Sequence, residues 1–230
     1  MSSLILFDID GTLVWANGAG ALAMERALLQ VYGTAGALEQ VYMAGMTDRA
    51  IISQALAGSG ISEGDILARW EPFTQAMARH MRVTAAERGI QACPGVFALL
   101  DALAGREDVL LGLVTGNLAH TAPIKLRAAG ISPTLFPIGG YGSDDSDRNK
   151  LPAIAARRAE ALTGERFSSS RIVVVGDTPA DVACGKAVGA KTVAVATGSS
   201  LQEVLQATQP DALLPDFSDL AHTLEAILPG

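Results

Sequence analysis

The 230-residue chain has little cysteine and little histidine. It contains two cysteines, Cys93 and Cys184, and three histidines, with no CxxC spacing and no zinc-like grouping among them. These counts exclude a disulfide framework and a zinc knuckle as the basis of the fold. Two isolated thiols are typical of proteins from reducing compartments, so we expect a cytoplasmic location.

Positive charge and long apolar runs are also scarce. The chain has 17 Lys and Arg against 24 Asp and Glu, a net charge of -7, which argues against nucleic acid or an anionic membrane as a partner. The apolar run before Asp8 and Asp10 is too short for a signal peptide, and no stretch reaches membrane-spanning length. With 49% hydrophobic residues, the sequence predicts a globular protein that acts on small molecules.

Short apolar runs bounded by turn residues recur along the chain, at 4–9, 109–114, 171–175, 192–196 and 212–214. Such runs suit parallel strands that are buried on both faces. Helical patterns separate them, at 95–103, 121–129, 151–162, 180–188, 201–207 and 218–228. This alternation predicts an α/β fold with a doubly wound, Rossmann-like parallel sheet.

The stretch 15–88 differs, because it shows helical spacing throughout and no convincing strand. Ala21, Met24, Leu28 and Val31 follow the helical interval. We interpret 15–88 as an all-helical cap inserted into a core formed by 1–14 and 89–230. Glycine-rich segments at both edges of the insert would serve as hinges.

Two carboxylates follow the first predicted strand, Asp8 and Asp10, just before a Gly-Thr-Leu turn. Residues two apart lie on the same side of an extended strand, and the carboxyl ends of parallel strands are where such sheets bind ligands. Asp8 can attack phosphorus, and protonated Asp10 can donate to the leaving oxygen. The alternative, a surface turn with two solvated acids, is disfavoured by the apolar run before it.

Thr115, Gly116 and Asn117 end the second predicted core strand. The Thr115 hydroxyl and neighbouring N–H groups can hold a phosphoryl oxygen without adding charge. The same tripeptide is also an ordinary strand-to-helix turn.

Asp177 and Asp181 follow the next apolar run, 171–175. Oxygen ligands of this kind suit Mg²⁺, which uses few carboxylates. The competing interpretation is that Asp177 or Thr178 caps the helix opened by Pro179.

The segment from Asp8 to Leu13 resembles the signature of the haloacid dehalogenase-like phosphatases, and the helical insert is similar to their type 1 cap. The resemblance implies a Mg²⁺-dependent phosphatase with an aspartyl phosphate on Asp8. It also implies that Asp8, the backbone carbonyl of Asp10 and Asp177 hold the metal, with Asp181 as a further ligand or a supporting residue. Because Asp10 is present, phosphate chemistry is favoured over the superfamily's dehalogenases and phosphonoacetaldehyde hydrolases.

The family also places a cation between Thr115 and Asp177, most often in Lys-Pro-x-Pro. This chain departs from that pattern and offers Arg148 and Lys150, either of which would neutralise the nucleophile and the phosphate. The sequence gives no reason to prefer one of them.

The loop 45–49 resembles the cap loop of phosphoglycolate phosphatase-like members. Thr47 and Arg49 are therefore candidate substrate contacts, although Thr47 or Asp48 equally suits a helix N-cap. The expected substrate is a small phosphorylated metabolite, with phosphoglycolate one candidate. A sugar phosphomutase of the β-phosphoglucomutase type and a non-catalytic binding protein are the alternatives. The expected oligomeric state is a monomer or a homodimer.

Overall fold

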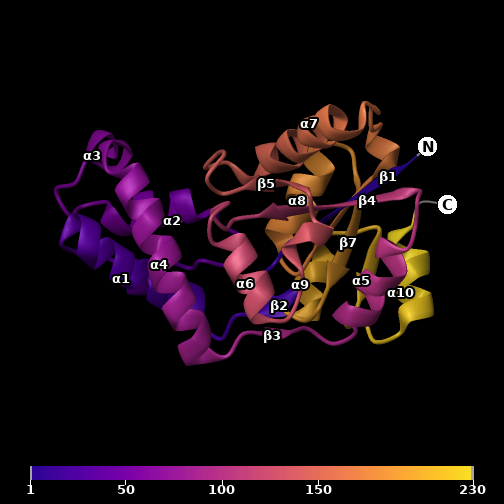
Figure 1. Cartoon of the computed structure of the whole chain (residues 1–230), viewed down its shortest axis with the longest axis horizontal. Helices are drawn as coiled ribbons and strands as arrows, with labels where there is room; N and C mark the ends of the chain where they lie inside the picture. Colours follow the sequence, from indigo (N-terminus) through magenta and orange to yellow (C-terminus); the bar gives the residue numbers. More distant parts are fainter. Residues whose placement is uncertain (1, 229–230) are drawn as a thin grey trace.

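The computed structural model describes residues 2–228, and its centre is a six-stranded sheet in which every neighbouring pair is parallel (Figure 1). The strands run in the order β5 (Ile138–Tyr141), β4 (Val109–Thr115), β1 (Ser3–Phe7), β6 (Ile172–Gly176), β7 (Lys191–Val195) and β8 (Ala212–Leu214). All five residues of β1 are buried, as expected for an inner strand of a sheet covered on both sides. The prediction of a doubly wound α/β fold is confirmed.

Helices cover both faces of this sheet, and the side chains of β1 alternate between two cores. Ile5 and Phe7 belong to the larger apolar cluster, which includes residues of α5 (Val96–Ala104) and α10 (Leu220–Ile227). Leu4 and Leu6 belong to the other, with α7 (Leu151–Thr163) and Cys184 of α8 (Pro179–Ala187). The remaining core helices are α6 (Ala122–Ala128) and α9 (Gln202–Ala207). The period-two pattern of a strand thus links two helical layers.

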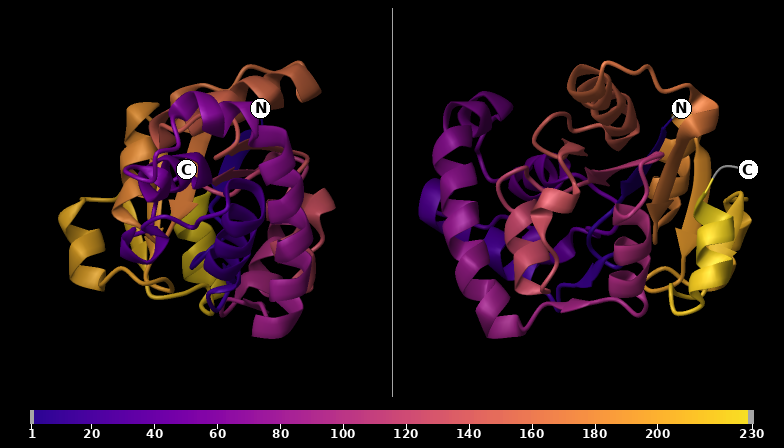
Figure 2. Two further views of the ribbon diagram at one scale, coloured as in Figure 1. Left: turned by 90° about the vertical axis from the view of Figure 1, so that its left-hand side faces the viewer. Right: turned by 45° about the vertical axis from the view of Figure 1, so that its right-hand side comes forward.

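A group of helices lies beyond the end of the sheet where β1 and β4 end (Figures 1 and 2). It consists of α1 (Ala19–Tyr32), α2 (Asp48–Leu56), α3 (Glu63–Ala68) and α4 (Trp70–Arg88), and α1 packs against α4. The rings of Tyr32 and Phe73 pack between them with centroids 6.0 Å apart. These helices fall within the predicted insert, and a boundary at 15–88 stays a prediction.

A short antiparallel ribbon connects the helical group to the sheet. It pairs β2 (Val14–Trp15) with β3 (Gln91–Ala92), so the chain leaves the core and returns to it side by side. The Trp15 indole N–H donates to the carbonyl of Thr197, at 2.7 Å, and thereby ties the ribbon to the core. The sequence patterns did not predict this ribbon, and placing Trp15 in a strand-free helical stretch was wrong.

Among the described residues, no helix combines the length and the apolar character needed to cross a bilayer. The two thiols, Cys93 and Cys184, are free and buried. Cys184 packs within the second apolar cluster.

Candidate active site

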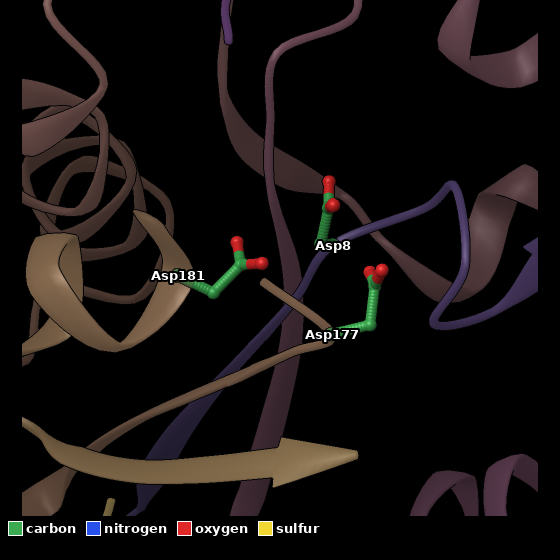
Figure 3. Close-up of side chains that lie close together, drawn as sticks. All are labelled: Asp8, Asp177 and Asp181. Carbon is green, nitrogen blue, oxygen red and sulfur yellow. The ribbon is translucent and has the colours of Figure 1, made fainter. Parts of the chain in front are cut away.

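Three neighbouring strands bring the predicted motifs to one edge of the sheet. Thr115 ends β4, Asp8 follows β1, and Asp177 follows β6, and these strands lie side by side in the order β4, β1, β6. The side chains of Asp8, Asp177 and Asp181 gather in one place (Figure 3), with one carboxylate oxygen from each within 4.8 Å of the others. All three residues are buried.

This burial makes ionisation of the cluster costly. Burial raises the pKa of Asp8 to about 6, against the opposing effect of the Arg148 guanidinium. Burial, followed by the charges of Asp181 and Asp8, raises the pKa of Asp177 to about 8, although the Thr12 hydroxyl donates to Asp177 Oδ1 at 2.9 Å. The site therefore holds three buried carboxylates and one guanidinium, so its negative charge exceeds its positive charge.

A divalent cation fits this cluster. Carboxylate oxygens are the donors that Mg²⁺ prefers. Glycines leave room for the Asp177 carboxylate, because a Cβ atom at Gly11 or at Gly198 would overlap it. The residues therefore match a divalent-metal site both in donor chemistry and in space.

The structure brings Arg148 to Asp8 and leaves Lys150 outside. Arg148 Nη2 lies 3.2 Å from Asp8 Oδ1 and 2.5 Å from Asp181 Oδ1. Arg148 Nη1 lies beside Gly116, because a Cβ atom built there would be 3.2 Å from it. The Lys150 side chain is 60% exposed and pairs with Asp145 at 3.0 Å. Both residues lie in the short 3-10 turn Arg148–Lys150, which turns one inward and the other outward.

Both oxygens of Asp181 already have partners. Oδ1 accepts from Arg148, while Oδ2 accepts from the backbone N–H and the hydroxyl of Thr178, at 2.9 and 2.6 Å. Thr178 caps α8 and forms a capping box with Asp181. Of the two roles expected for Asp181, this geometry favours support of Arg148 over metal ligation.

Asp10 lies apart from the cluster and is held by residues that follow β4. Lys125 Nζ lies 2.8 and 2.6 Å from the two Asp10 oxygens, and the Asn117 amide donates to Oδ2 at 2.7 Å. Lys125 is 5% exposed, and the sequence interpretation did not single it out. A signal was present, since Lys125 lies between Ala122 and Leu126 on the buried side of a predicted helix.

The predicted cap-loop residues make structural contacts. Thr47 is the N-cap of α2, and its hydroxyl also donates to the Ser146 carbonyl at 2.8 Å. Neither Thr47 nor the half-buried Arg49 lines the cavity described below, whereas Asp48 does. Asp48 Oδ2 accepts from the Leu118 N–H at 3.0 Å, and burial raises the pKa of Asp48 to about 6.

A cavity of about 540 Å³ separates the helical group from the sheet edge, a volume in the range of small-molecule sites. Its core side includes Asp8, Asp10, Thr115, Gly116 and Asn117. The predicted motifs therefore face one cavity large enough for a small metabolite.

The sequence model of the family described as "Haloacid dehalogenase-like hydrolase" matches residues 5–195. A nucleophile candidate after β1, a cation beside it and two further acids after β6 agree with a hydrolase of this class. The chain belongs to the haloacid dehalogenase-like hydrolases.

Individual relatives indicate which kind of hydrolase the chain resembles. The chain is 28% identical to a "Phosphoglycolate phosphatase" of Rhodospirillum rubrum, over all of this chain and 94% of that protein. It is 26% identical to a "Pyrophosphatase PpaX" of Bacillus pumilus, over 94% and 93% of the two chains. A crystal structure of a hydrolase from Pseudomonas syringae shares the fold, with TM-score 0.71, 21% identity and 98% of each chain covered. These relatives support a phosphatase.

Proposed function

We propose that the protein is a magnesium-dependent phosphatase that hydrolyses a small phosphate monoester through an aspartyl phosphate on Asp8. One observation carries the proposal. Asp8 lies in a buried acid cluster with Arg148, while Asp10 faces the same cavity with Lys125 as its partner. Two carboxylates that face one cavity can serve as nucleophile and as acid–base group.

The first half-reaction transfers the phosphoryl group to the protein. A carboxylate oxygen of Asp8 attacks phosphorus as the ester P–O bond breaks, and Asp10 gives its proton to the departing oxygen. The Arg148 guanidinium, whose Nη1 lies beside Gly116, and the Thr115 hydroxyl stabilise the oxygens of the transferred group. Gly116 and Asn117 shape the phosphate side of the cavity, and Asn117 also fixes Asp10.

In the second half-reaction Asp10 accepts a proton from water, which attacks phosphorus and releases inorganic phosphate together with the free Asp8 carboxylate. Magnesium would be held by Asp8, Asp177 and the Asp10 backbone carbonyl, and would neutralise charge on the phosphoryl oxygens. Asp181 keeps Arg148 in position through their hydrogen bond. The helical group would exclude water during the first attack.

The location, the binding partner and the oligomeric state are also part of the proposal. We infer a cytoplasmic location, because Cys93 and Cys184 are both free thiols. A small phosphorylated metabolite is the expected partner, and light scattering distinguishes the expected monomer from a homodimer. Phosphoglycolate and pyrophosphate, which the names of the relatives print, belong in the first set of compounds to test.

The test is release of inorganic phosphate from a panel of phosphate esters, with and without Mg²⁺. The wild type is compared with Asp8→Asn and with Asp108→Asn, an exposed control. We expect release that needs Mg²⁺, is abolished in Asp8→Asn and is unchanged in Asp108→Asn. Release that persists in Asp8→Asn would contradict the nucleophile, and no release from any ester by the wild type would contradict the phosphatase.

A further inference from the structure

The cavity has few positively charged side chains. Among the described residues, the cavity is lined by only one lysine, Lys125, and one arginine, Arg148, together with the aspartates Asp8, Asp10, Asp48 and Asp177. Any anionic group of a substrate other than the phosphate must therefore find its counter-charge in Lys125 or Arg148.

Both cations are already paired with carboxylates of the chain. Lys125 Nζ lies within 2.8 Å of both oxygens of Asp10, and only 6% of its side chain is exposed. Arg148 bonds Asp181 and lies 3.2 Å from Asp8, so its guanidinium lies beside the nucleophile. Removing Arg148 from its partners would leave the buried carboxylates of Asp8 and Asp181 unpaired, which is costly. Drawing Lys125 away from Asp10, whose side chain is 40% exposed, would break the ion pair that holds the proposed general acid.

The helical side of the cavity is largely apolar, with Asn17 as an uncharged polar residue. Its wall is formed by Ala21, Met24, Met43, Ala44, Met46 and Ile51. The ionisable group that the helices add is a carboxylate, Asp48, at the start of α2. A leaving group that points away from Asp8 therefore meets methyl groups and thioethers, with one acid at the edge.

From this arrangement we infer that the site selects phosphate monoesters whose leaving group is uncharged and largely apolar, and discriminates against esters with a carboxylate or a second phosphate. The inference rests on the proposed function. A second anion that lies away from the proposed metal loses its hydration, gains no unpaired side-chain cation and approaches Asp48. An apolar leaving group loses no polar contact and removes apolar surface from water.

A longer leaving group would meet the same shortage of positive charge. A second cavity of about 360 Å³ adjoins the first and shares Gly18, Ala21 and Met43 with it. Its charged lining consists of Glu25, Glu39 and Arg88, two acids against one base.

Matched pairs of esters test the preference. We compare 2-hydroxyethyl phosphate with 2-phosphoglycolate, and benzyl phosphate with 4-carboxybenzyl phosphate, by kcat/KM with Mg²⁺ at pH 7.5. We expect the uncharged member of each pair to be preferred by about tenfold or more, the size of discrimination that a few pocket contacts supply. Equal rates, or preference for the anionic member in either pair, would overturn the inference.

A variant at Ala21 links the preference to the wall. Ala21 is exposed, lies in α1 and lines both cavities, so a long side chain is tolerated there. We expect Ala21→Lys to raise kcat/KM for the anionic esters and to reduce the ratio within each pair, whereas Ala21→Gln, of similar length without charge, leaves the ratio unchanged. An equal effect of both substitutions would show that size, not charge, sets the preference and would overturn the inference.

Binding separates this inference from the proposed function. Calorimetric titration of Asp8→Asn with the same four esters measures affinity without turnover. Tighter binding of the uncharged esters, combined with no hydrolysis by the wild type, would contradict the phosphatase and support the charge preference. Hydrolysis by the wild type, combined with tighter binding of the anionic esters, would retain the phosphatase and overturn the preference.

Discussion

Arg148 and Lys150 are two positions apart in the chain but have opposite surroundings, one buried beside Asp8 and one exposed beside Asp145. We expect Arg148→Met to lower kcat by about 100-fold or more, the usual cost of removing a donor that stabilises transition-state charge. Lys150→Met serves as the matched control and should change kcat by less than about twofold, because exposed ion pairs contribute little.

Steady-state kinetics of phosphate release measures both variants. Because Arg148→Met leaves Asp8 and Asp181 without their cation, the folded fraction is determined first by circular dichroism. Loss of activity in Lys150→Met, with Arg148→Met folded and active, would reverse the assignment of the cation.

Lys125 contacts the carboxylate that we assign as general acid, so we treat it as a positioning residue. Lys125→Met removes the charge but keeps most of the length, and Asp10 loses its ion pair. We expect kcat for an alkyl phosphate to fall by about 10- to 100-fold, part of the usual contribution of general acid catalysis.

A comparison of esters with different leaving groups distinguishes a positioning role of Lys125 from a general disturbance of the site. With 4-nitrophenyl phosphate, whose leaving oxygen needs little protonation, the loss in Lys125→Met should be several times smaller than with an alkyl ester. Equal losses with both esters would contradict the positioning role and indicate a general disturbance of the cavity.

At the scale of elements, the start of α2 is hydrogen-bonded to the loop after β4. The Asp48 N–H donates to the Gly116 carbonyl at 2.7 Å, and the Asp48 carboxylate accepts from Leu118. Gly116 permits this approach, since a Cβ atom there would overlap the Met46 carbonyl oxygen. The helical group therefore contacts the loop after β4 through backbone atoms and through the Asp48 carboxylate.

In Gly116→Ala, the added methyl group should push the loop after β4 and the segment before α2 apart. We expect kcat/KM for phosphate esters to fall by about 10- to 100-fold, because small displacements of positioning groups are costly in catalysis. Gly105→Ala is the control, since the atom nearest to its Cβ would be 3.8 Å away and Gly105 lies at the end of α5. Comparable losses in both variants would show that the contact at Gly116 has no special role.

The elements differ in how far local sequence predicts them. Strands β1, β4, β6, β7 and β8 coincide with apolar runs, because buried parallel strands need such residues. β5 was missed, since Ile138–Tyr141 holds two glycines. A Cβ atom at Gly140 would overlap the Leu151 backbone, so the glycine reflects packing of β5 against α7, a contact between two separate elements.

Contacts between separate elements also limit how far the site can be predicted from local sequence. The motif at Asp8 and the strand ends at Thr115 and Asp177 predict their convergence, because parallel strands end at one edge. The choice between Arg148 and Lys150 depends on the direction of a single turn, and the partner of Asp10 depends on where α6 packs. Both depend on tertiary contacts that no local pattern contains.

At the scale of the whole molecule, Asp48 connects overall stability to pH. Burial raises its pKa from 3.8 to about 6, so folding favours the protonated form. Its contribution to stability is complete below about pH 4 and is lost as pH rises through about 6. Asp48→Asn keeps an acceptor for the Leu118 N–H but does not titrate.

The difference in free energy of unfolding, Asp48→Asn minus wild type, should therefore increase between pH 4 and pH 7, by at most about 3 kcal/mol. Urea denaturation at several pH values measures it. Asp108→Asn is the control and should give a nearly flat difference over this range, because a hydrogen bond from Arg106 lowers the pKa of Asp108 and its contribution changes only below about pH 4. A flat difference for Asp48→Asn would contradict an ionised, buried Asp48.

The ribbon of β2 and β3 has a consequence for how this protein can change. The polypeptide between Trp15 and Gln91 starts and finishes at two paired residues, so it is an excursion with adjoining ends. Insertions whose ends meet leave the host chain unstrained, since the rest of the sequence spans no new distance. One contiguous stretch of the gene can therefore be exchanged for another that encodes a different pocket wall. Related proteins can then keep the reaction and act on different esters.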